Sequence, residues 1–360
     1  MIQLKDLCQK ASSNIAQKDL EGHEGQYPIY GASGLIGYVD FYKQENPYVA
    51  VVKDGAGIGR VMCLPEKSSV IGTMQYILPN EGVNVHYLAF AMEHMNLAKY
   101  FSGATIPHIY FKDYGKEKLL ERTEKEQKSI AEILNKMDSL ISLRKQQIAK
   151  LDELVKARFV EMFGKASLLA QNQTKRLEEC CISISGGNTP SMQHPEYYGG
   201  NIPFVKSGDV KGDYIVESTL TLTKTALTET TAKILPKSTL IVVIRSAALL
   251  KEFRIGMLMV DAVINQDLKA LQVSEDFLPV YLMWAIKMQH QVLLNKVQTM
   301  LTSHIRMEDL LNLKIGTPPL SLQNQFAAFV ERVDQQKQTV QQSLEKLELM
   351  KKALMQEYFG

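Results

Sequence analysis

The stretch TEKEQKSIAEILNKMDSLISLRKQQIAKLDELVKARFVEMFG, residues 123–164, decides the fold. It contains no proline, and its only glycine is the last residue. Thr123 and Glu126 at its start form the pattern of a capping box. From Ile130 to Met162, a seam of mostly apolar residues recurs at alternating spacings of four and three. This period of about 3.5 residues predicts a long helix that packs against another helix, because about 12 residues is the usual length of a core helix.

The chain repeats itself. It ends on Glu357–Gly360, which has the pattern of the last four residues of that stretch, 196 positions later. At this offset 15 of 57 positions are identical, starting with His108 and His304. Residues 4–8 also resemble residues 177–181, at an offset of 173. The second copy is therefore 23 residues longer in between, where we detect little resemblance.

Charged residues interrupt both helical seams at different places. Arg144 and Arg158 interrupt the first seam, and Lys337 and Lys351 interrupt the second. In the repeat alignment each of them corresponds to an apolar residue, so the irregularities of the two helices are complementary. Two long helices that each need a partner most simply pair with each other.

The repeat and the helices together predict the architecture. We expect an α+β fold with an internal pseudo-two-fold repeat, in which two mixed α/β globular domains are joined by two long helices forming an antiparallel coiled coil. The predicted domains are residues 1–121 and 164–318, and the predicted helices are residues 122–163 and 319–360.

The central parts of the two repeat copies, whose sequences diverge, have the pattern of mixed α/β domains. Residues 49–52 and 60–64 are predicted strands on either side of a glycine-rich turn, and residues 85–92 are a predicted helix. In the second copy, residues 239–244 form a predicted buried strand, and residues 276–295 are predicted to be the matching helix.

Composition excludes several classes of protein. The 360 residues are 45% hydrophobic and 22% charged, which is typical of a globular chain. Neither an 18-residue apolar run nor the apolar core of a signal peptide is present, and the four cysteines lack metal-ligand spacing. We therefore expect a reduced, cytoplasmic chain. The net charge of +2 is close to neutral, so bulk charge does not itself indicate nucleic-acid binding.

The sequence offers no self-contained active site. Asp54–Gly59 superficially resembles a nucleotide or S-adenosylmethionine loop, but a strand-like segment follows it where such a loop would open a helix. A tight turn between strands is the better interpretation. His108 and His304 recur without any acid or nucleophile, which favours a structural role for both. We predict no catalytic residue, metal or cofactor site in this chain.

Each half of the chain contains a series of short motifs. In the first half the motifs are Tyr27–Gly37, Lys53–Gly59 and Gly103–His108; in the second they are Gly187–Pro190, Ile202–Asp209, Ile264–Leu271 and Pro318–Gln323. In their order, these motifs resemble a known family, the DNA-specificity (S) subunits of type I restriction–modification systems. The first helix departs from the family's start motif, because Arg122–Gln127 has no proline.

The resemblance implies a non-catalytic subunit. Each globular domain would be a target-recognition domain for one half of a bipartite, asymmetric double-stranded DNA site. The helices would set the spacing and dock two methyltransferase (modification) subunits. Restriction/translocase subunits would complete the complex, and S-adenosylmethionine, ATP and Mg would bind to the partners.

Candidate DNA-binding residues follow from base chemistry, since Arg or Lys suits guanine and Asn or Gln suits adenine. They are Tyr30, Ser33, Lys53, Arg60 and Gln75 in the first domain and Asn188, Thr189, Lys206, Arg245, Ser246 and Arg306 in the second. An ordinary surface role is the alternative for each. Asn265–Asp267 is predicted to be mainly a structural turn.

Two other functions compete with this hypothesis. A coiled-coil scaffold or interaction protein would share the long helices without recognising DNA. A DNA-modifying enzyme in its own right would need the cofactor loop that we do not find.

Overall fold

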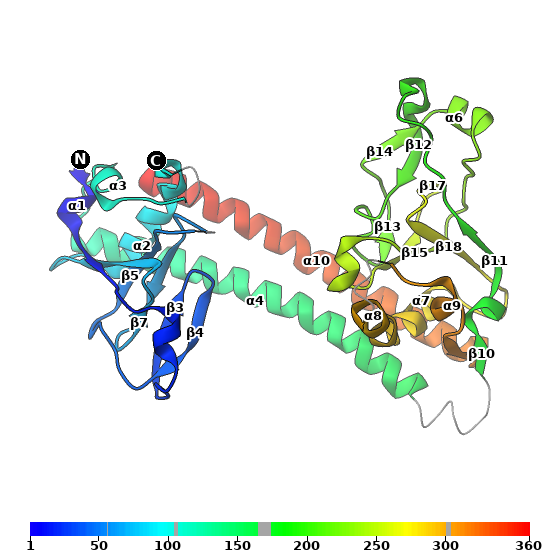
Figure 1. Cartoon of the computed structure of the whole chain (residues 1–360), viewed down its shortest axis with the longest axis horizontal. Helices are drawn as coiled ribbons and strands as arrows, with labels where there is room; N and C mark the ends of the chain where they lie inside the picture. Colours follow the sequence, from blue (N-terminus) through cyan, green and yellow to red (C-terminus); the bar gives the residue numbers. More distant parts are fainter. Residues whose placement is uncertain (56, 104–106, 165–173, 300–303) are drawn as a thin grey trace. The chain divides into compact units, whose positions relative to one another are not determined.

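A computed structural model describes the chain except for residues 56, 104–106, 165–173 and 300–303 (Figure 1). Parts of the predicted glycine turn and of the Gly103–His108 motif thus lie outside the described residues. The fold is α+β, as predicted, and the chain forms two compact units. Unit 1 consists of Met1–Gln147 with Thr339–Gly360, and unit 2 is Ile148–Gln338. The 40-residue helices α4 (Glu124–Phe163) and α10 (Leu320–Phe359) contribute residues to both.

Unit 1 contains two principal sheets, a four-stranded one in the order β2-β8-β5-β6 and a three-stranded one in the order β4-β3-β7. Its elements before α4 are β1 (Ile2–Gln3), α1 (Leu4–Leu7), β2 (Cys8–Ser12), η1 (Gln17–Leu20), β3 (Tyr27–Gly31), β4 (Gly34–Val39), β5 (Tyr48–Val52), β6 (Val61–Leu64), β7 (Ser69–Val70), β8 (Met74–Pro79), α2 (Val85–His94), η2 (Leu97–Tyr100), α3 (Phe111–Tyr114) and β9 (Lys118–Leu119).

Unit 2 has a five-stranded sheet in the order β11-β18-β15-β16-β13 and a three-stranded one in the order β14-β12-β17. Its elements between the long helices are β10 (Thr174–Arg176), η3 (Leu177–Cys180), β11 (Cys181–Gly186), η4 (Pro195–Tyr197), β12 (Tyr198–Val205), β13 (Tyr214–Ile215), β14 (Leu220–Leu222), α6 (Lys224–Glu229), β15 (Leu240–Val243), η5 (Ala247–Leu250), β16 (Ile255–Leu258), β17 (Val263–Ile264), β18 (Leu268–Val273), α7 (Pro279–Lys287), α8 (His290–Thr299), α9 (Met307–Leu311) and β19 (Lys314–Gly316).

The two units share one topology even where their sequences show little resemblance. The order β2-β8-β5-β6 corresponds to β11-β18-β15-β16, and the order β4-β3-β7 corresponds to β14-β12-β17. Each of the two three-stranded sheets contains one parallel pair. The central strands β5 and β15 are buried at every position. In the divergent central parts of the two copies, the repeat therefore preserves the pattern of burial and strand pairing. Many different apolar residues satisfy this pattern equally well.

Most of the extra length of the second copy precedes its central strand. Between Ser12 and Val49 the chain advances 37 positions, whereas between the equivalent Gly186 and Leu240 it advances 54. The additional segment includes β13, which pairs in parallel with β16 as a fifth strand. In the described part of unit 1, β6 is instead the edge of its sheet.

Most of the predicted elements are confirmed. The strands on either side of the glycine turn are β5 and β6, which pair antiparallel, and the buried strand is β15. The helix predicted at residues 276–295 was wrong in its extent. The chain breaks at Met288 and Gln289 into α7 and α8, and α7 alone corresponds to α2.

A repeated glutamine shows why some identities persist. The side-chain oxygen of Gln127 accepts a hydrogen bond from the backbone N–H of Asn84 (3.0 Å), at the start of α2. Gln323 does the same for Leu278 (2.8 Å), at the start of α7. Both side chains are almost fully buried, so each fixes its long helix against its own unit.

The long helices begin as the sequence predicts. The backbone N–H of Thr123 donates to Glu126 (2.8 Å), and the N–H of Glu126 donates to the Thr123 hydroxyl (3.3 Å), which completes the capping box. In the second copy, α10 begins at Leu320, directly after two prolines that suit a helix start.

Within each unit the segments of α4 and α10 run antiparallel. In unit 1, Asp138 pairs with Lys351 (2.7 Å) and Lys145 pairs with Glu348 (3.0 Å). In unit 2, Lys337 pairs with Asp152 (2.5 Å). The lysines that interrupt the second seam are thus each matched by an acid of α4, and every position of both predicted seams is buried or half-buried.

A second apolar stripe at the helix ends was not predicted from the sequence. Phe163, at the end of α4, packs against Tyr281 of α7 (ring centroids 4.9 Å apart). Phe359, at the end of α10, packs against Tyr87 of α2 (5.3 Å). These pairs are equivalent in the repeat, so each domain core is closed by the far end of a long helix.

Candidate nucleic-acid interface

In unit 2 the predicted DNA-binding residues gather around one polar turn, Asn265–Asp267. The side chain of Asn265 donates to the Asp267 carboxylate (2.9 Å) and accepts from the Asp267 N–H (3.3 Å). Asn265 is only 7% exposed, which confirms the prediction of a structural turn. The turn joins β17 to β18.

Two predicted segments contact this turn from one side. The N–H of Asn188 donates to the carbonyl of Ile264 (3.2 Å), and the Thr189 hydroxyl hydrogen-bonds to the Gln266 side chain. The N–H of Asn265 donates to the carbonyl of Val205 (3.1 Å), which places Lys206 beside the turn. Lys206 itself is half-buried, and its N–H is bound by Asp209 (2.8 Å).

Arg245, which follows β15, also contacts the turn, and Ser246 is the next residue along the chain. The N–H of Arg245 donates to the carbonyl of Asp267 (3.2 Å), and Arg245 forms an isolated β-bridge with His304. Its side chain is exposed. The Ser246 hydroxyl accepts from the N–H of Ala248 (3.2 Å) and caps η5, so part of its hydrogen-bonding capacity is used locally.

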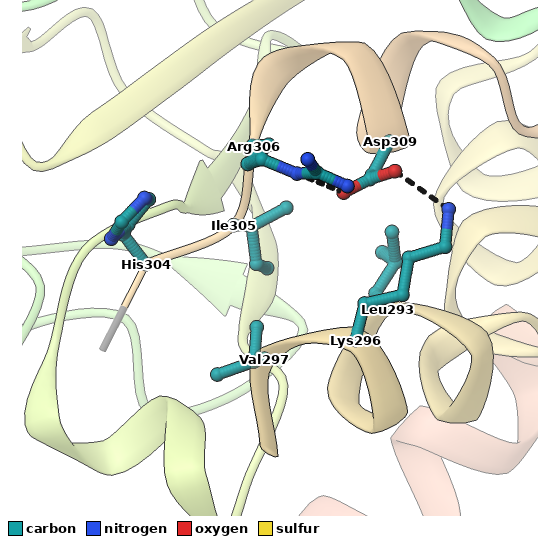
Figure 2. Close-up of a pocket in the computed structure, with 7 residues that line it drawn as sticks. All are labelled: Leu293, Lys296, Val297, His304, Ile305, Arg306 and Asp309. Atoms are coloured by element: carbon teal, nitrogen blue, oxygen red, sulfur yellow. Dashed lines mark hydrogen bonds and ion pairs between the residues drawn. The ribbon is translucent and has the colours of Figure 1, made fainter. Parts of the chain in front are cut away.

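Arg306 is an exposed residue two positions after His304. Its Nε donates to Asp309 (2.9 Å), and Lys296 pairs with the other oxygen of the same carboxylate (2.6 Å), as Figure 2 shows. The hydrogen bond from Lys296, followed by that from Arg306, holds the pKa of Asp309 below its usual range. Two cations on one carboxylate leave a net positive charge at this surface.

In unit 1, Lys53 and Gln75 line a common pocket of about 220 Å³. Three lysines surround it, and its full lining is Lys10, Ser12, Lys53, Gln75, His108, Ile109, Tyr110, Phe111 and Lys112. Lys112 lies over the ring of Tyr110 (5.1 Å to the centroid), and Tyr110 is 46% exposed. Cations beside an exposed aromatic ring suit a nucleic-acid strand, which offers both phosphates and base faces.

The other three predicted residues of unit 1 lie away from this pocket. A guanidinium N–H of Arg60 donates to the carbonyl of Ala32 (2.6 Å), which brings Arg60 to the β3–β4 turn that carries the exposed Ser33. Tyr30 is half-buried in β3. Burial, followed by the neighbouring Tyr38, raises the pKa of Tyr30.

Gln75 is less available than its sequence position suggests. It is 8% exposed, and its side-chain oxygen accepts from the Tyr114 hydroxyl (2.8 Å). Gln75 lines the pocket, but its side-chain oxygen is already engaged in a hydrogen bond.

The candidate surfaces of the two units are equivalent in the fold. In unit 1 the N–H of Ile109 donates to the carbonyl of Lys53 (3.0 Å), and in unit 2 that of Ile305 donates to Ile244 (2.8 Å). Both repeated histidines therefore lie where the central strand ends, within backbone pairing, as the structural interpretation predicts. The same backbone position carries Asp54 in one unit and Arg245 in the other.

Several residues at these surfaces escaped the sequence analysis. Lys10, Tyr110 and Lys112 reach the pocket of unit 1 only through strand pairing and the backbone contacts of residues 108–109 with residues 53–54. In unit 2, Lys269 occupies the position of Gln75, because each pairs with the second-last residue of the central strand. No local signal marks these residues.

Comparison with known proteins identifies the family. The sequence matches the type I restriction modification DNA specificity domain over residues 1–153 and 171–349. The chain therefore belongs to this family, with two copies of the domain. Across the described ranges, no helix is both long and apolar enough to cross a membrane.

Individual relatives agree with this assignment. The chain is 26% identical over 152 residues to the type I restriction enzyme EcoR124I/EcoR124II specificity subunit of Escherichia coli. That match spans 41% of this chain and only 38% of the relative's length.

Two solved structures share the fold. The S subunit of a type I restriction–modification system from M. genitalium superposes with a TM-score of 0.64 at 16% identity, over 100% of this chain and 95% of that one. A chain from a study of complex assembly and conformational transition of the type I R-M system gives 0.55 at 14% identity, over 99% and 96%.

Proposed function

We propose that this chain is the DNA-specificity subunit of a type I restriction–modification complex, and that each unit recognises one half of a bipartite, asymmetric site. The main support for the proposal is that the candidate surfaces of the two units share one backbone arrangement. They carry different polar side chains at equivalent positions. Such a pair of surfaces suits two unlike half-sites, whereas two identical copies would suit a palindrome. The family membership favours this function over a coiled-coil scaffold.

The charge of these surfaces fits a DNA-binding role that is shared with partner subunits. Lysines around the unit 1 pocket and arginines beside the unit 2 turn can neutralise phosphates, and Arg245 can also bind a guanine edge. The net charge of +2 is small for a protein that binds DNA alone. We infer that partner subunits supply part of the contact with the backbone.

We assign no chemistry to this chain itself. Two methyltransferase subunits would carry S-adenosylmethionine, and restriction/translocase subunits would use ATP and Mg in the cytoplasm. Support for this division comes from the family's description as a specificity domain. It also agrees with the glycine-rich turn after β5, which leads into strand β6 and not into a helix that could bind a phosphate.

Replacing Arg245 by Ala tests the assignment of half-sites. The target is first located by sequencing methylated bases. Loss of a base contact should weaken binding to the half recognised by unit 2 by about 5- to 150-fold, the equivalent of ~1–3 kcal/mol, at one base position. Binding is measured on duplexes with either half scrambled, in the presence of the methyltransferase subunits.

The matched control is Arg176→Ala, an exposed arginine of β10 that pairs with Glu178. It should leave both halves unchanged. Equal weakening of both halves by Arg245→Ala would contradict independent recognition by the two units.

We also propose that α4 and α10 set the gap between the half-sites. Inserting four residues after Gln147 and four after Ser343 should lengthen each helix by about 6 Å. The apolar stripe then continues with a drift of roughly 40°, which a helix pair can absorb as a stutter. Because DNA rises ~3.4 Å per base pair, the gap should grow by one or two pairs.

Mapping of methylated sites measures this gap. The control is an insertion in α4 alone, which should misalign the seam and destabilise the protein. Retained activity with an unchanged gap in the double insertion would exclude the helices as the spacer.

A further inference from the structure

In unit 2, the extra strand β13 packs a half-buried tyrosine against the long helix α10. The Tyr214 hydroxyl donates to Asp334 (2.5 Å), and the carbonyl of Asp213 accepts from the N–H of Met257 in β16 (2.8 Å). The carboxylate of Asp213 pairs with Lys287, whose Nζ lies 4.6 Å from the ring centroid of Trp284. An extended segment thus fills the space between the sheet edge, α7 and the long helix.

Unit 1 has a pocket of about 280 Å³ at the equivalent place. Its lining is Val61, Cys63, His86, Ala89, Phe90, Glu93, Asn135 and Asp138. Among the described residues no strand of unit 1 corresponds to β13, and β6 is the sheet edge there.

The repeat relates the two places residue by residue. Asp138 and Asp334 are identical positions at the offset of 196. The hydroxyls of Tyr87 and Tyr281 each donate to a backbone carbonyl that lies just before a long helix. This shared contact aligns α2 with α7. That alignment places Phe90 at the position of Trp284 and Glu93 at that of Lys287. Strand register places Cys63 at the position of Met257.

The charge at this place is inverted between the units. Where unit 2 has Lys287 facing Asp213, unit 1 has Glu93, which is 55% exposed. Lys351 pairs with both Asp138 (2.7 Å) and Glu93 (3.6 Å), so one ammonium group serves two carboxylates. The pocket therefore carries a net negative charge that suits an additional cation.

Cys63 does not make this pocket a reactive site. Its sulfur lies 3.5 Å from Nδ1 of His86. Burial raises the pKa of the Cys63 thiol to about 11, so the thiol stays protonated at neutral pH. The pair lines the pocket without forming a thiolate nucleophile.

We propose that this pocket and the β6 edge bind an extended segment of a partner protein, in which a basic residue directly precedes a tyrosine. The tyrosine would lie against Phe90 with its hydroxyl on Asp138, and the basic side chain would pair with Glu93. By the register of unit 2, the carbonyl of the basic residue would accept from the N–H of Cys63.

The sequence of unit 1 also limits how far such a segment pairs. In unit 2 the N–H of Met259 donates to the carbonyl of Ile215 (2.9 Å), but Pro65 stands at the equivalent position and has no N–H. Pairing would end at the tyrosine, so the side chains in the pocket supply most of the specificity. The β13 segment of a second copy fits poorly, because its Asp213 would face Glu93.

Peptide binding to the full chain tests this proposal, which does not depend on DNA recognition. The probe is a fluorescent nine-residue peptide, residues 210–218 of this chain with Asp213→Lys. It should bind the wild-type protein at least tenfold more tightly than the unchanged peptide, and replacing its tyrosine by phenylalanine should weaken it. In the Glu93→Lys protein the preference between the two peptides should reverse.

Glu24→Lys is the matched control, since it makes the same change of charge at an exposed position of unit 1. It should keep the wild-type preference. Asp138→Ala, which removes the acceptor, should abolish the difference between tyrosine and phenylalanine peptides, with circular dichroism confirming its fold. Absence of peptide binding, or an unchanged preference in Glu93→Lys, would overturn the proposal.

Discussion

Replacing Leu134 by Ala should lower the free energy of unfolding of unit 1 by about 2–5 kcal/mol, the usual cost of removing a buried leucine side chain. Leu134 is 0% exposed, and it belongs to the buried cluster that contains Leu88 of α2 with Met355 and Phe359 of α10. The cavity left by the substitution would lie where α2, α4 and α10 meet, so the surrounding side chains can move little to fill it. Urea unfolding followed by hydrogen exchange in unit 1 measures the loss.

Leu143→Ala is the matched control on the same helix. Leu143 is 58% exposed, so its truncation should change stability by no more than about 0.5 kcal/mol. Similar losses for the two variants would show that the seam of α4 does not stabilise unit 1.

Replacing Gly187 by Ala should remove recognition of the half-site assigned to unit 2. A Cβ at this position would lie 2.1 Å from the carbonyl oxygen of Ile264 and 2.3 Å from that of Asn265. Both are backbone atoms where β17 meets the polar turn, so segment 187–190 must move away and the contact between Thr189 and Gln266 is lost. We expect a cost at or above the ~1–3 kcal/mol typical of overpacking, and at least a tenfold loss of binding.

Gly208→Ala provides the control in the same unit. No atom lies within 4 Å of a Cβ added there, and the residue belongs to another of the family-like motifs. It should keep binding to both half-sites. Hydrogen exchange at residues 265–267 should rise only in Gly187→Ala, and normal binding by that variant would refute the role assigned to the turn.

The long helices could be predicted because their signal is local. A seam at heptad spacing, a capping box and a fixed repeat offset all occur within a short stretch of chain. The stripe that includes Phe163 and Phe359 could not be assigned, since its partners, Tyr281 and Tyr87, lie far away in sequence. Position 288, where the predicted helix breaks, likewise carries no proline or glycine.

The residues of the candidate site also fall into two groups, those that the sequence predicts and those that it does not. Thr189 and Lys206 belong to motifs whose order along the chain resembles a family, and the fold brings them to one turn. Lys10 and Lys112 belong to no motif, and only the register between β2 and β8 and the backbone contact of Ile109 with Lys53 bring them to Lys53. Gln75 has a suitable side chain but is mostly buried, which a residue type alone does not reveal.

The contact between Phe359 and Tyr87 has a consequence for synthesis on the ribosome. Unit 2 is a continuous piece of chain, whereas unit 1 combines Met1–Gln147 with Thr339–Gly360. Tyr87 emerges early, but the ring that covers it, that of Phe359, lies 272 positions further along the chain. Because non-local contacts form only after the intervening chain exists, unit 2 can complete its core while that of unit 1 is still open. The unit whose synthesis begins first is therefore completed last.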